Sequence, residues 1–126
     1  MRLARLKTRR DFLRVADTRA RFATPGLILQ VRRHSADETS ALPEIRVGFT
    51  VSKKVGNAVV RNRVKRRLRA AADEVIAARS KPGRDYVLVG RRESEERAYP
   101  DLLGDIETAL ARTGSSRSEA AQDKQS

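Results

Sequence analysis

The chain has 126 residues, no cysteine and a formal net charge of +12 at pH 7. This length suits one domain with a modest core, and the lack of cysteine excludes disulfides and thiolate chemistry. The only histidine, His34, reads as an ordinary loop residue after a strand, which argues against a zinc site or a Ser/His triad. The charge favours a nucleic acid or an acidic membrane surface as partner.

The first predicted element is a short helix with a basic surface. Thr8 and Asp11 have the spacing of a capping box, and Phe12 and Val15 give the helix an apolar edge up to about Thr18. The basic residues of this end are Arg2, Arg5, Lys7, Arg9, Arg10 and Arg14. They form either a solvated helix surface or a patch that faces a polyanion.

Two segments with alternating polarity follow. Residues 27–31 and 45–51 place apolar side chains at every second position, which predicts two strands that each bury one face. Polar residues 35–43 between them predict a surface loop joining two antiparallel strands. Whether a further short strand forms near Phe22 is left open.

A basic helix is predicted after Asn57, whose side chain suits an N-cap. Its apolar positions recur at spacings of three and four and form one stripe, composed of Val60, Val64, Leu68, Ala71 and Val75. The side away from the stripe carries Asn62, Lys65, Arg66 and Arg69.

Eight positive charges occur in this region before the first acid. They are Lys53, Lys54, Arg61, Arg63, Lys65, Arg66, Arg67 and Arg69. Like charges at helical spacing destabilise a helix by a few tenths of a kcal/mol per pair. Fold stability therefore does not account for the arrangement, whereas binding to a polyanion does.

The remaining segments complete the predicted fold. Pro82 and Gly83 end the basic helix near Ala78, and the nearly all-apolar run 85–90 predicts a strand buried on both faces. Pro100 suits the first turn of a last helix. The core stripe of that helix is Leu102, Leu103, Ile106 and Leu110.

These elements predict an α+β fold with a small single sheet of three to four strands packed with three helices. The order is helix, strand, strand, an optional further strand, basic central helix, strand and helix. Residues 1–113 form a single domain, and polar residues 114–126 form a disordered tail. With no long apolar run and no signal pattern, we expect a soluble, cytoplasmic protein.

The string VSKKVGNAVVRNRVKRRLR closely resembles the signature of the protein subunit of bacterial ribonuclease P, with Arg61-Asn62-Arg63 as the RNR motif. The resemblance covers about residues 1–113. It implies an RNA-binding subunit of an endonuclease in which the RNA is the catalyst and removes the 5′ leader of precursor tRNA. The resemblance places Mg²⁺ on the RNA subunit and substrate, and it implies neither a catalytic residue nor a metal site in this chain.

The family's functional residues transfer by position. The RNA-binding set is Lys53, Lys54, Arg61, Asn62, Arg63, Lys65, Arg66 and Arg69. The leader-binding cleft maps to Phe12, Ile28, Gln30, Thr50 and Ser52. Phe12 is equally compatible with the core of the first helix. Because the family often has aromatics where this chain has Ala16 and Gln30, leader contact is expected to be weaker or to shift towards Phe22.

The expected partners are ribonuclease P RNA and precursor tRNA, without DNA or membrane, and the protein is expected to be a monomer or weak dimer within the holoenzyme. Physics alone also allows a general RNA-binding or ribosomal protein. A DNA-binding helix would need a helix-turn-helix partner or a dimer seam, and an interfacial membrane helix would need larger apolar anchors. The carboxylates of Asp37, Glu38, Glu93, Glu95 and Glu96 are expected to be solvated.

Overall fold

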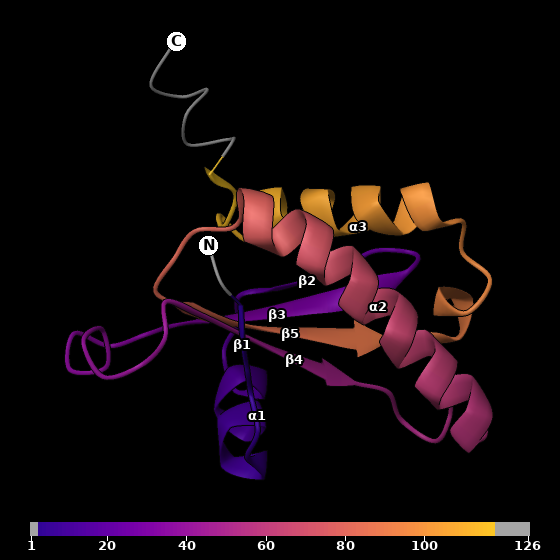
Figure 1. Ribbon diagram of the computed structural model, residues 1–126, viewed down its shortest axis with the longest axis horizontal. Helices are drawn as coiled ribbons and strands as arrows, with labels where there is room; N and C mark the ends of the chain where they lie inside the picture. The colour runs from indigo at the N-terminus through magenta and orange to yellow at the C-terminus, as the bar shows by residue number, and fades with distance from the viewer. Residues whose placement is uncertain (1–2, 118–126) are drawn as a thin grey trace, which may run out of the picture.

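The computed structural model describes residues 3–117. Along the chain the elements are β1 (Ala4–Arg5), α1 (Arg9–Ala16), β2 (Arg21–Ala23), β3 (Leu27–Arg33), β4 (Ile45–Thr50), α2 (Ala58–Arg79), β5 (Arg84–Gly90), the 3-10 helix η1 (Arg92–Ser94) and α3 (Tyr99–Arg112). The strands form one sheet in the order β1-β4-β5-β3-β2. Helix α1 packs on one face of this sheet, and α2 and α3 pack on the other (Figure 1). The predicted α+β class and the three helices are confirmed.

Strand β5 is the centre of the sheet. It pairs in parallel with β4 and antiparallel with β3. Strands β3 and β4 therefore run in opposite directions, as expected, but β5 lies between them. Val87 packs towards α1 and Leu88 packs towards α2 and α3. Burial on both faces explains the nearly unbroken apolar sequence of this strand.

The main core lies between the sheet and the pair α2 and α3. The α2 stripe is confirmed, since Val64, Leu68, Ala71 and Val75 are buried and Val60 is half-buried against them. The sheet contributes Leu27, Leu29, Val31, Ile45, Val47, Tyr86 and Leu88, and α3 contributes Leu102, Ile106, Ala109 and Leu110. One face of α2 is thus fixed in the core, which leaves the opposite face to solvent.

Both predicted N-caps are present. The Thr8 hydroxyl accepts from the Asp11 N–H at 3.2 Å, and the Asn57 side chain accepts from the Val60 N–H at 3.0 Å. Helix α2 extends to Arg79, and the turn into β5 uses Gly83 with φ +74°. That left-handed conformation favours glycine.

The two ends of the folded part differ from the sequence expectation. Strand β1 was not predicted, because two residues cannot show a period; it pairs in parallel with β4. At the other end, Ser115 is fully buried, and its carbonyl accepts from the Lys81 N–H at 2.8 Å. The folded part therefore extends beyond the predicted boundary at residue 113. The rest of the predicted tail, residues 118–126, lies outside the described residues.

No helix within residues 3–117 is both long enough and apolar enough to cross a membrane.

Candidate nucleic-acid interface

The outer face of α2 presents the polar side chains that the sequence placed opposite its apolar stripe. Asn62 and Arg66 are exposed there, and Arg61 is half-buried at the border of the stripe. A surface hollow of about 390 Å³ is lined by Val59, Asn62, Lys65, Arg66 and Arg69. We call it the basic hollow, because its lining is three cations, one amide and one valine. Such a lining suits an anionic group.

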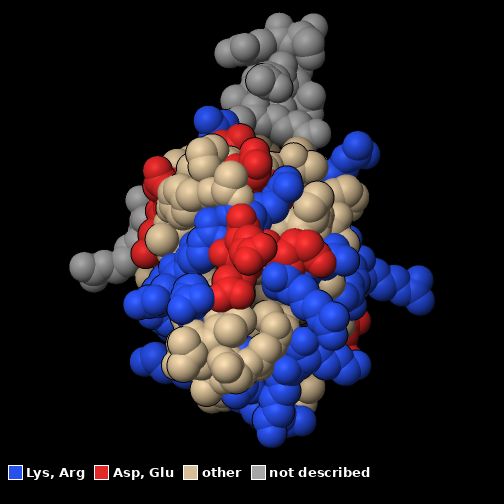
Figure 2. All heavy atoms as spheres, turned by 90° about the vertical axis from the view of Figure 1, so that its right-hand side faces the viewer, with Lys and Arg blue, Asp and Glu red and all other residues tan. Residues whose placement is uncertain are grey.

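Lys53 and Lys54 are exposed in the turn that precedes α2. The first turn of α2 contains no acid, so the positive end of the helix dipole adds to their charge. The Arg92 side chain donates to the Lys54 carbonyl at 3.3 Å and ties this turn to η1. Figure 2 looks onto this end of the molecule and shows Lys and Arg side chains around a compact group of acids.

Two arginines of α2 are already engaged within the protein. Arg67 donates to the carbonyl oxygens of Ser94 at 2.6 Å and Glu95 at 2.8 Å, and it also donates to the Arg97 carbonyl. Arg63 Nη1 lies 2.5 Å from Glu95 Oε2. The expectation that Glu95 is solvated is wrong, because its side chain is 24% exposed and paired. Arg63 remains in the predicted RNA-binding set, but with an acidic partner.

Arg69 lies near an aromatic ring that helps to place it. Its guanidinium carbon is 5.9 Å from the centroid of the Phe49 ring, and that of Arg5 is 5.5 Å away. Such contacts are worth about 0.5–1 kcal/mol at exposed sites. Phe49 is half-buried at the edge of the main core. It therefore links the core to the basic surface and brings Arg5 of β1 close to α2.

A groove lies between α1 and the part of the sheet that α1 leaves uncovered. This α1 groove has a volume of about 280 Å³ and is lined by Phe12, Leu13, Ala16, Gln30, Thr50, Val87 and Val89. Three of the predicted cleft residues therefore meet in one place. Ile28 is half-buried and pairs in register with Val89, so it flanks the groove. Ser52 is exposed just beyond β4.

Phe12 has both of the roles that the sequence left open. Its ring packs against the buried cluster of Leu6, Val15 and Val87, and it also lines the groove. A Cβ atom on Gly48 would lie 2.5 Å from the Phe12 ring. This close approach of ring and backbone explains a glycine in the interior of β4.

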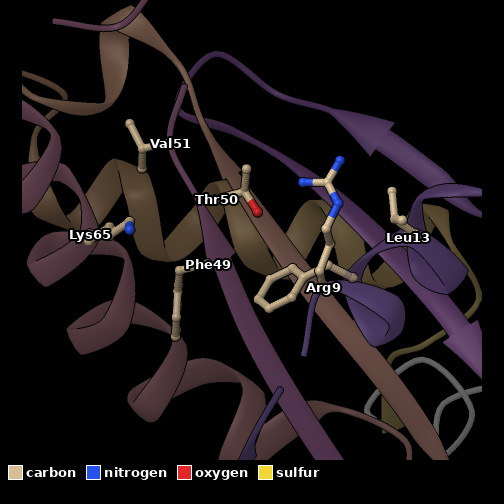
Figure 3. Close-up of a pocket in the computed structure, with 7 residues that line it drawn as sticks. Arg9, Leu13, Phe49, Thr50, Val51 and Lys65 are labelled. Atoms are coloured by element: carbon tan, nitrogen blue, oxygen red, sulfur yellow. The ribbon is translucent and has the colours of Figure 1, made fainter. Parts of the chain in front are cut away.

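A second hollow joins the α1 groove to the basic hollow. This linking hollow has a volume of about 380 Å³ and is lined by Arg9, Phe12, Leu13, Phe49, Thr50, Val51 and Lys65. Arg9 from α1 and Lys65 from α2 lie on opposite sides of the β4 segment that carries Thr50 (Figure 3). Because Lys65 lines both hollows and Leu13 and Thr50 also line the groove, the three depressions form one continuous surface.

Arg9 and Leu13 line this surface; the sequence named Arg9 only as one member of the basic patch of the first helix, and it did not mark Leu13 as a site residue. Leu13 is 51% exposed, which is unusual for a large apolar side chain. The available signal was that Leu13 lies off the apolar edge formed by Phe12 and Val15, so it has no place in the core. Arg9 could not be distinguished from its basic neighbours.

Phe22 does not replace the missing aromatics of the groove. It pairs directly opposite Leu29, so the two side chains share a face of the sheet. That is the face of the main core, and Phe22 packs there below Arg112, whose guanidinium carbon is 5.7 Å from its ring centroid. The expected shift of leader contact towards Phe22 is therefore wrong.

A buried ion-pair network supports the α1 side of the sheet. Fully buried Asp85 accepts from Arg46 at 2.8 and 2.7 Å and from Arg32 at 3.0 Å. Burial alone would raise the pKa of the Asp85 carboxyl, but the hydrogen bonds from Arg46 and His34 outweigh it and lower the pKa. His34 Nε2 lies 2.7 Å from Asp85, and its side chain is 1% exposed. The prediction of an ordinary loop histidine is therefore wrong.

Glu38 extends this network from the loop before β4. It accepts two hydrogen bonds from Arg32, at 2.9 and 3.1 Å, and forms a salt bridge with Arg14 of α1 at 3.1 Å. The hydrogen bonds from Arg32 and from the Ser35 N–H lower the pKa of Glu38. The expectation of a solvated Glu38 is wrong, because this side chain joins the loop to α1 and β3.

Within residues 3–117 there is no group of three or more His, Cys, Asp or Glu side chains that could hold a metal ion. The most buried carboxylate, Asp85, is already bonded to arginines and His34. The described residues therefore form no cluster of carboxylates or histidines that would hold Mg²⁺.

Comparison with known proteins identifies relatives over most of the chain. Residues 1–114 match the family model described as Ribonuclease P. The chain is 55% identical over 113 residues to the ribonuclease P protein component of Paramagnetospirillum magneticum, covering 90% of this chain and 84% of the relative. It is 48% identical over 106 residues to that of Ruegeria pomeroyi, covering 83% and 82%.

Solved structures agree with this likeness. The ribonuclease P protein of Thermotoga maritima has a TM-score of 0.68 and 25% identity, covering 86% of this chain and 96% of that chain. The ribonuclease P protein of Staphylococcus aureus has a TM-score of 0.67 at 24% identity, covering 85% and 92%, which bears on the fold alone.

Proposed function

This chain belongs to the ribonuclease P protein family, and from that premise we propose that it is the protein subunit of a ribonuclease P ribonucleoprotein. In this role it binds the catalytic RNA and the 5′ leader of precursor tRNA, and it supports endonucleolytic removal of the leader. The observation that carries the proposal is the continuous surface of basic hollow, linking hollow and α1 groove. It offers a site for a structured RNA beside a site for a single strand.

The basic face of α2 suits the RNA subunit. Arginine can place two hydrogen bonds on one phosphate, and the Asn62 amide can both donate to and accept from a base or a ribose 2′-hydroxyl. Lys53 and Lys54 add charge beside the α2 N-terminus, where free N–H groups favour a phosphate. The proposed contact set is Lys53, Lys54, Arg61, Asn62, Lys65, Arg66 and Arg69, with Arg63, which is paired with Glu95, at its edge.

The α1 groove suits the extruded leader. A base stacked on an aromatic ring such as Phe12 gains about 1–3 kcal/mol, and Gln30 and Thr50 can hydrogen-bond to base edges. Arg9 and Lys65 stand beside Thr50 and can meet leader phosphates. Ala16 lines the groove in place of a second ring. We therefore expect a leader contact that is present but weaker than in relatives with more aromatics.

In this proposal the hydrolysis of the phosphodiester bond, and any Mg²⁺ that would activate water for it, would belong to the RNA subunit and the substrate. The chain's own residues bind and orient the two RNAs. They need supply no general base, nucleophile or metal ligand.

Cleavage of a leader-bearing precursor tRNA at low Mg²⁺ tests the proposal. Bacterial ribonuclease P RNA is assayed with the protein, without it, and against the protein alone. We expect acceleration only when RNA and protein are together. Arg66→Ala should remove most of that acceleration, whereas Arg79→Ala should keep it. Arg79 lies at the far end of the same helix in an exposed pair with Glu107.

If the protein binds RNA without accelerating cleavage, it is a general RNA-binding or ribosomal protein. Cleavage by the protein alone would show that this chain has an active site of its own.

A further inference from the structure

The segment after β5 is fixed between α2 and the turn that joins β2 to β3. Ser94 is fully buried; its hydroxyl donates to the Gly26 carbonyl at 2.5 Å and accepts from the Arg91 N–H at 2.7 Å. On the other side, Arg67 donates to the carbonyl of Glu95 at 2.8 Å. Because hydrogen bonds hold this backbone from two sides, Glu95 has a defined position.

Glu95 is the acid of this segment that meets the basic face of α2. Its Oε2 atom lies 2.5 Å from Arg63 Nη1. Glu93 instead lies 3.9 Å from Arg91. Glu96 is exposed and, among residues 3–117, forms no salt bridge. The three acids therefore have the same charge and neighbouring positions but different partners.

The pair cancels a charge that RNA phosphates would otherwise meet. A phosphate bound by the remaining donors of Arg63 would lie about 6 Å from the Glu95 carboxylate, where repulsion between unit charges in water changes affinity about threefold. A flexible strand bound by charge alone would experience this repulsion in full. A structured RNA centred on Asn62 and Arg66 depends less on Arg63 at the edge of the face.

We propose that Glu95 is a specificity-determining counter-charge, which neutralises Arg63 and so weakens the binding of non-partner RNA more than that of the ribonuclease P RNA. This inference rests on the proposed function, since it requires a partner RNA that docks by shape. Glu95 acts through Arg63, so its role is positioning and not catalysis.

The test compares the full chain with its Glu95→Gln and Glu96→Gln variants. Dissociation constants are measured over a range of salt concentrations for bacterial ribonuclease P RNA and for an unstructured oligouridylate. Glutamine keeps the shape of Glu95 and can still accept from Arg63, so the fold is retained, and circular dichroism checks this. Both variants change the net charge equally, so a difference between them reports the Arg63 contact. The same comparison in an Arg63→Gln background measures the energetic coupling between Glu95 and Arg63.

We expect Glu95→Gln to bind oligouridylate about threefold more tightly and to steepen its salt dependence by about 0.7 in log–log slope. Its affinity for ribonuclease P RNA should change less than twofold, and Glu96→Gln should match the wild type on both RNAs. In the Arg63→Gln background, Glu95→Gln should lose its effect.

Two results would overturn the inference while leaving the proposed function intact. One is that Glu95→Gln and Glu96→Gln have equal affinities for each RNA. The other is that Glu95→Gln increases the affinity for both RNAs equally. A wild-type protein that does not prefer ribonuclease P RNA over oligouridylate would instead overturn the proposed function, and this inference with it.

Discussion

Asp85 shows how much of the structure depends on one residue. Its carboxylate joins Arg46 of β4 to Arg32 of β3 across the central strand, and Arg46 continues to Asp11 of α1 at 3.3 Å. The α1 groove needs α1 to stay in place on the sheet. The buried network therefore stabilises the groove without lining it.

Asp85→Asn is expected to lower the free energy of unfolding by about 3–5 kcal/mol, because removing one partner of a buried ion pair leaves the others uncompensated. Urea denaturation followed by circular dichroism measures this change. Asp37→Asn makes the same chemical change at an exposed loop position and is expected to have almost no effect. A loss of stability at position 85 no larger than at position 37 would contradict the structural role of the network.

Acid should weaken the fold through the same groups. Asp85 and Glu38 have pKa values that are lower in the folded protein than in the unfolded chain, where they are about 3.9 and 4.3. Their stabilisation is therefore fully present above about pH 5 and is lost as the pH falls through 4 towards the folded pKa values.

Urea midpoints measured from pH 7 to pH 3 test this pH dependence. The urea midpoint of the wild type should stay constant down to about pH 5 and then fall. The midpoint of Asp85→Asn should fall less steeply, because one of the titrating groups is gone. If the urea midpoints of the two proteins fell equally steeply with pH, the loss of stability in acid would arise from other groups.

Among the helices and strands, the sequence predicted the ones that have a strong local signal. The capping side chains Thr8 and Asn57 and the α2 stripe are local features, so α1 and α2 could be placed. The strands that pair with β5 could not be predicted, because alternation in a strand does not indicate which strand it pairs with. Strand β1 is too short for a period. The sequence around Ser115 is polar like a tail, although Arg84 of β5 donates to Ser115 Oγ and Arg117 donates to the Ala78 carbonyl of α2.

A chain that ends at Thr113 is therefore expected to be less stable than one that ends at Arg117. Arg84 is buried, which lowers the pKa of its guanidinium, and it donates to the Gly114 carbonyl at 3.3 Å and to Ser115 Oγ at 2.9 Å. Truncation removes both acceptors, and an unsatisfied buried donor costs about 1–3 kcal/mol. Thermal unfolding of the two truncated proteins measures the difference; equal midpoints would show that residues 114–117 add nothing.

The same limits apply to the candidate site. The string around Arg61-Asn62-Arg63 identified the basic face, and the period of α2 gave its orientation. The sequence did not reveal that Glu95 pairs with Arg63, that Arg67 donates to carbonyl groups, or that Arg9 and Lys65 line one hollow from opposite sides of β4. Each of these arrangements brings together segments that lie far apart in the chain, so no local pattern contains them.

At the scale of the whole molecule, not all of the positive charge is available to RNA. Eight cations lie between residues 53 and 69, but Arg67 binds carbonyl oxygens and Arg63 is paired with Glu95. The remaining six are Lys53, Lys54, Arg61, Lys65, Arg66 and Arg69. Log affinity for ribonuclease P RNA should therefore fall with log salt at a slope of about −4, instead of about −6 for all eight.

Filter binding between 50 and 300 mM salt (roughly the range in which such slopes are resolved) measures this dependence. Arg66→Ala should reduce the slope by about 0.7, and Arg67→Ala should leave the slope unchanged while lowering stability. A wild-type slope near −6 would mean that RNA displaces the internal partners of Arg63 and Arg67.

We propose that α2 docks the RNA subunit while the α1 groove holds the leader. The most direct test is the affinity of the assembled ribonucleoprotein for leader-bearing precursor tRNA relative to mature tRNA. It compares two matched variants, Leu13→Glu in the groove and Val59→Glu in the basic hollow, since both residues are exposed apolar side chains.

The wild type should prefer the leader-bearing substrate by about tenfold, the value of one stacked base. Leu13→Glu should lose most of this preference and still bind the RNA subunit. Val59→Glu should need more protein for assembly but keep the preference once assembled. A preference that survives Leu13→Glu unchanged would contradict the assignment of the leader to the groove.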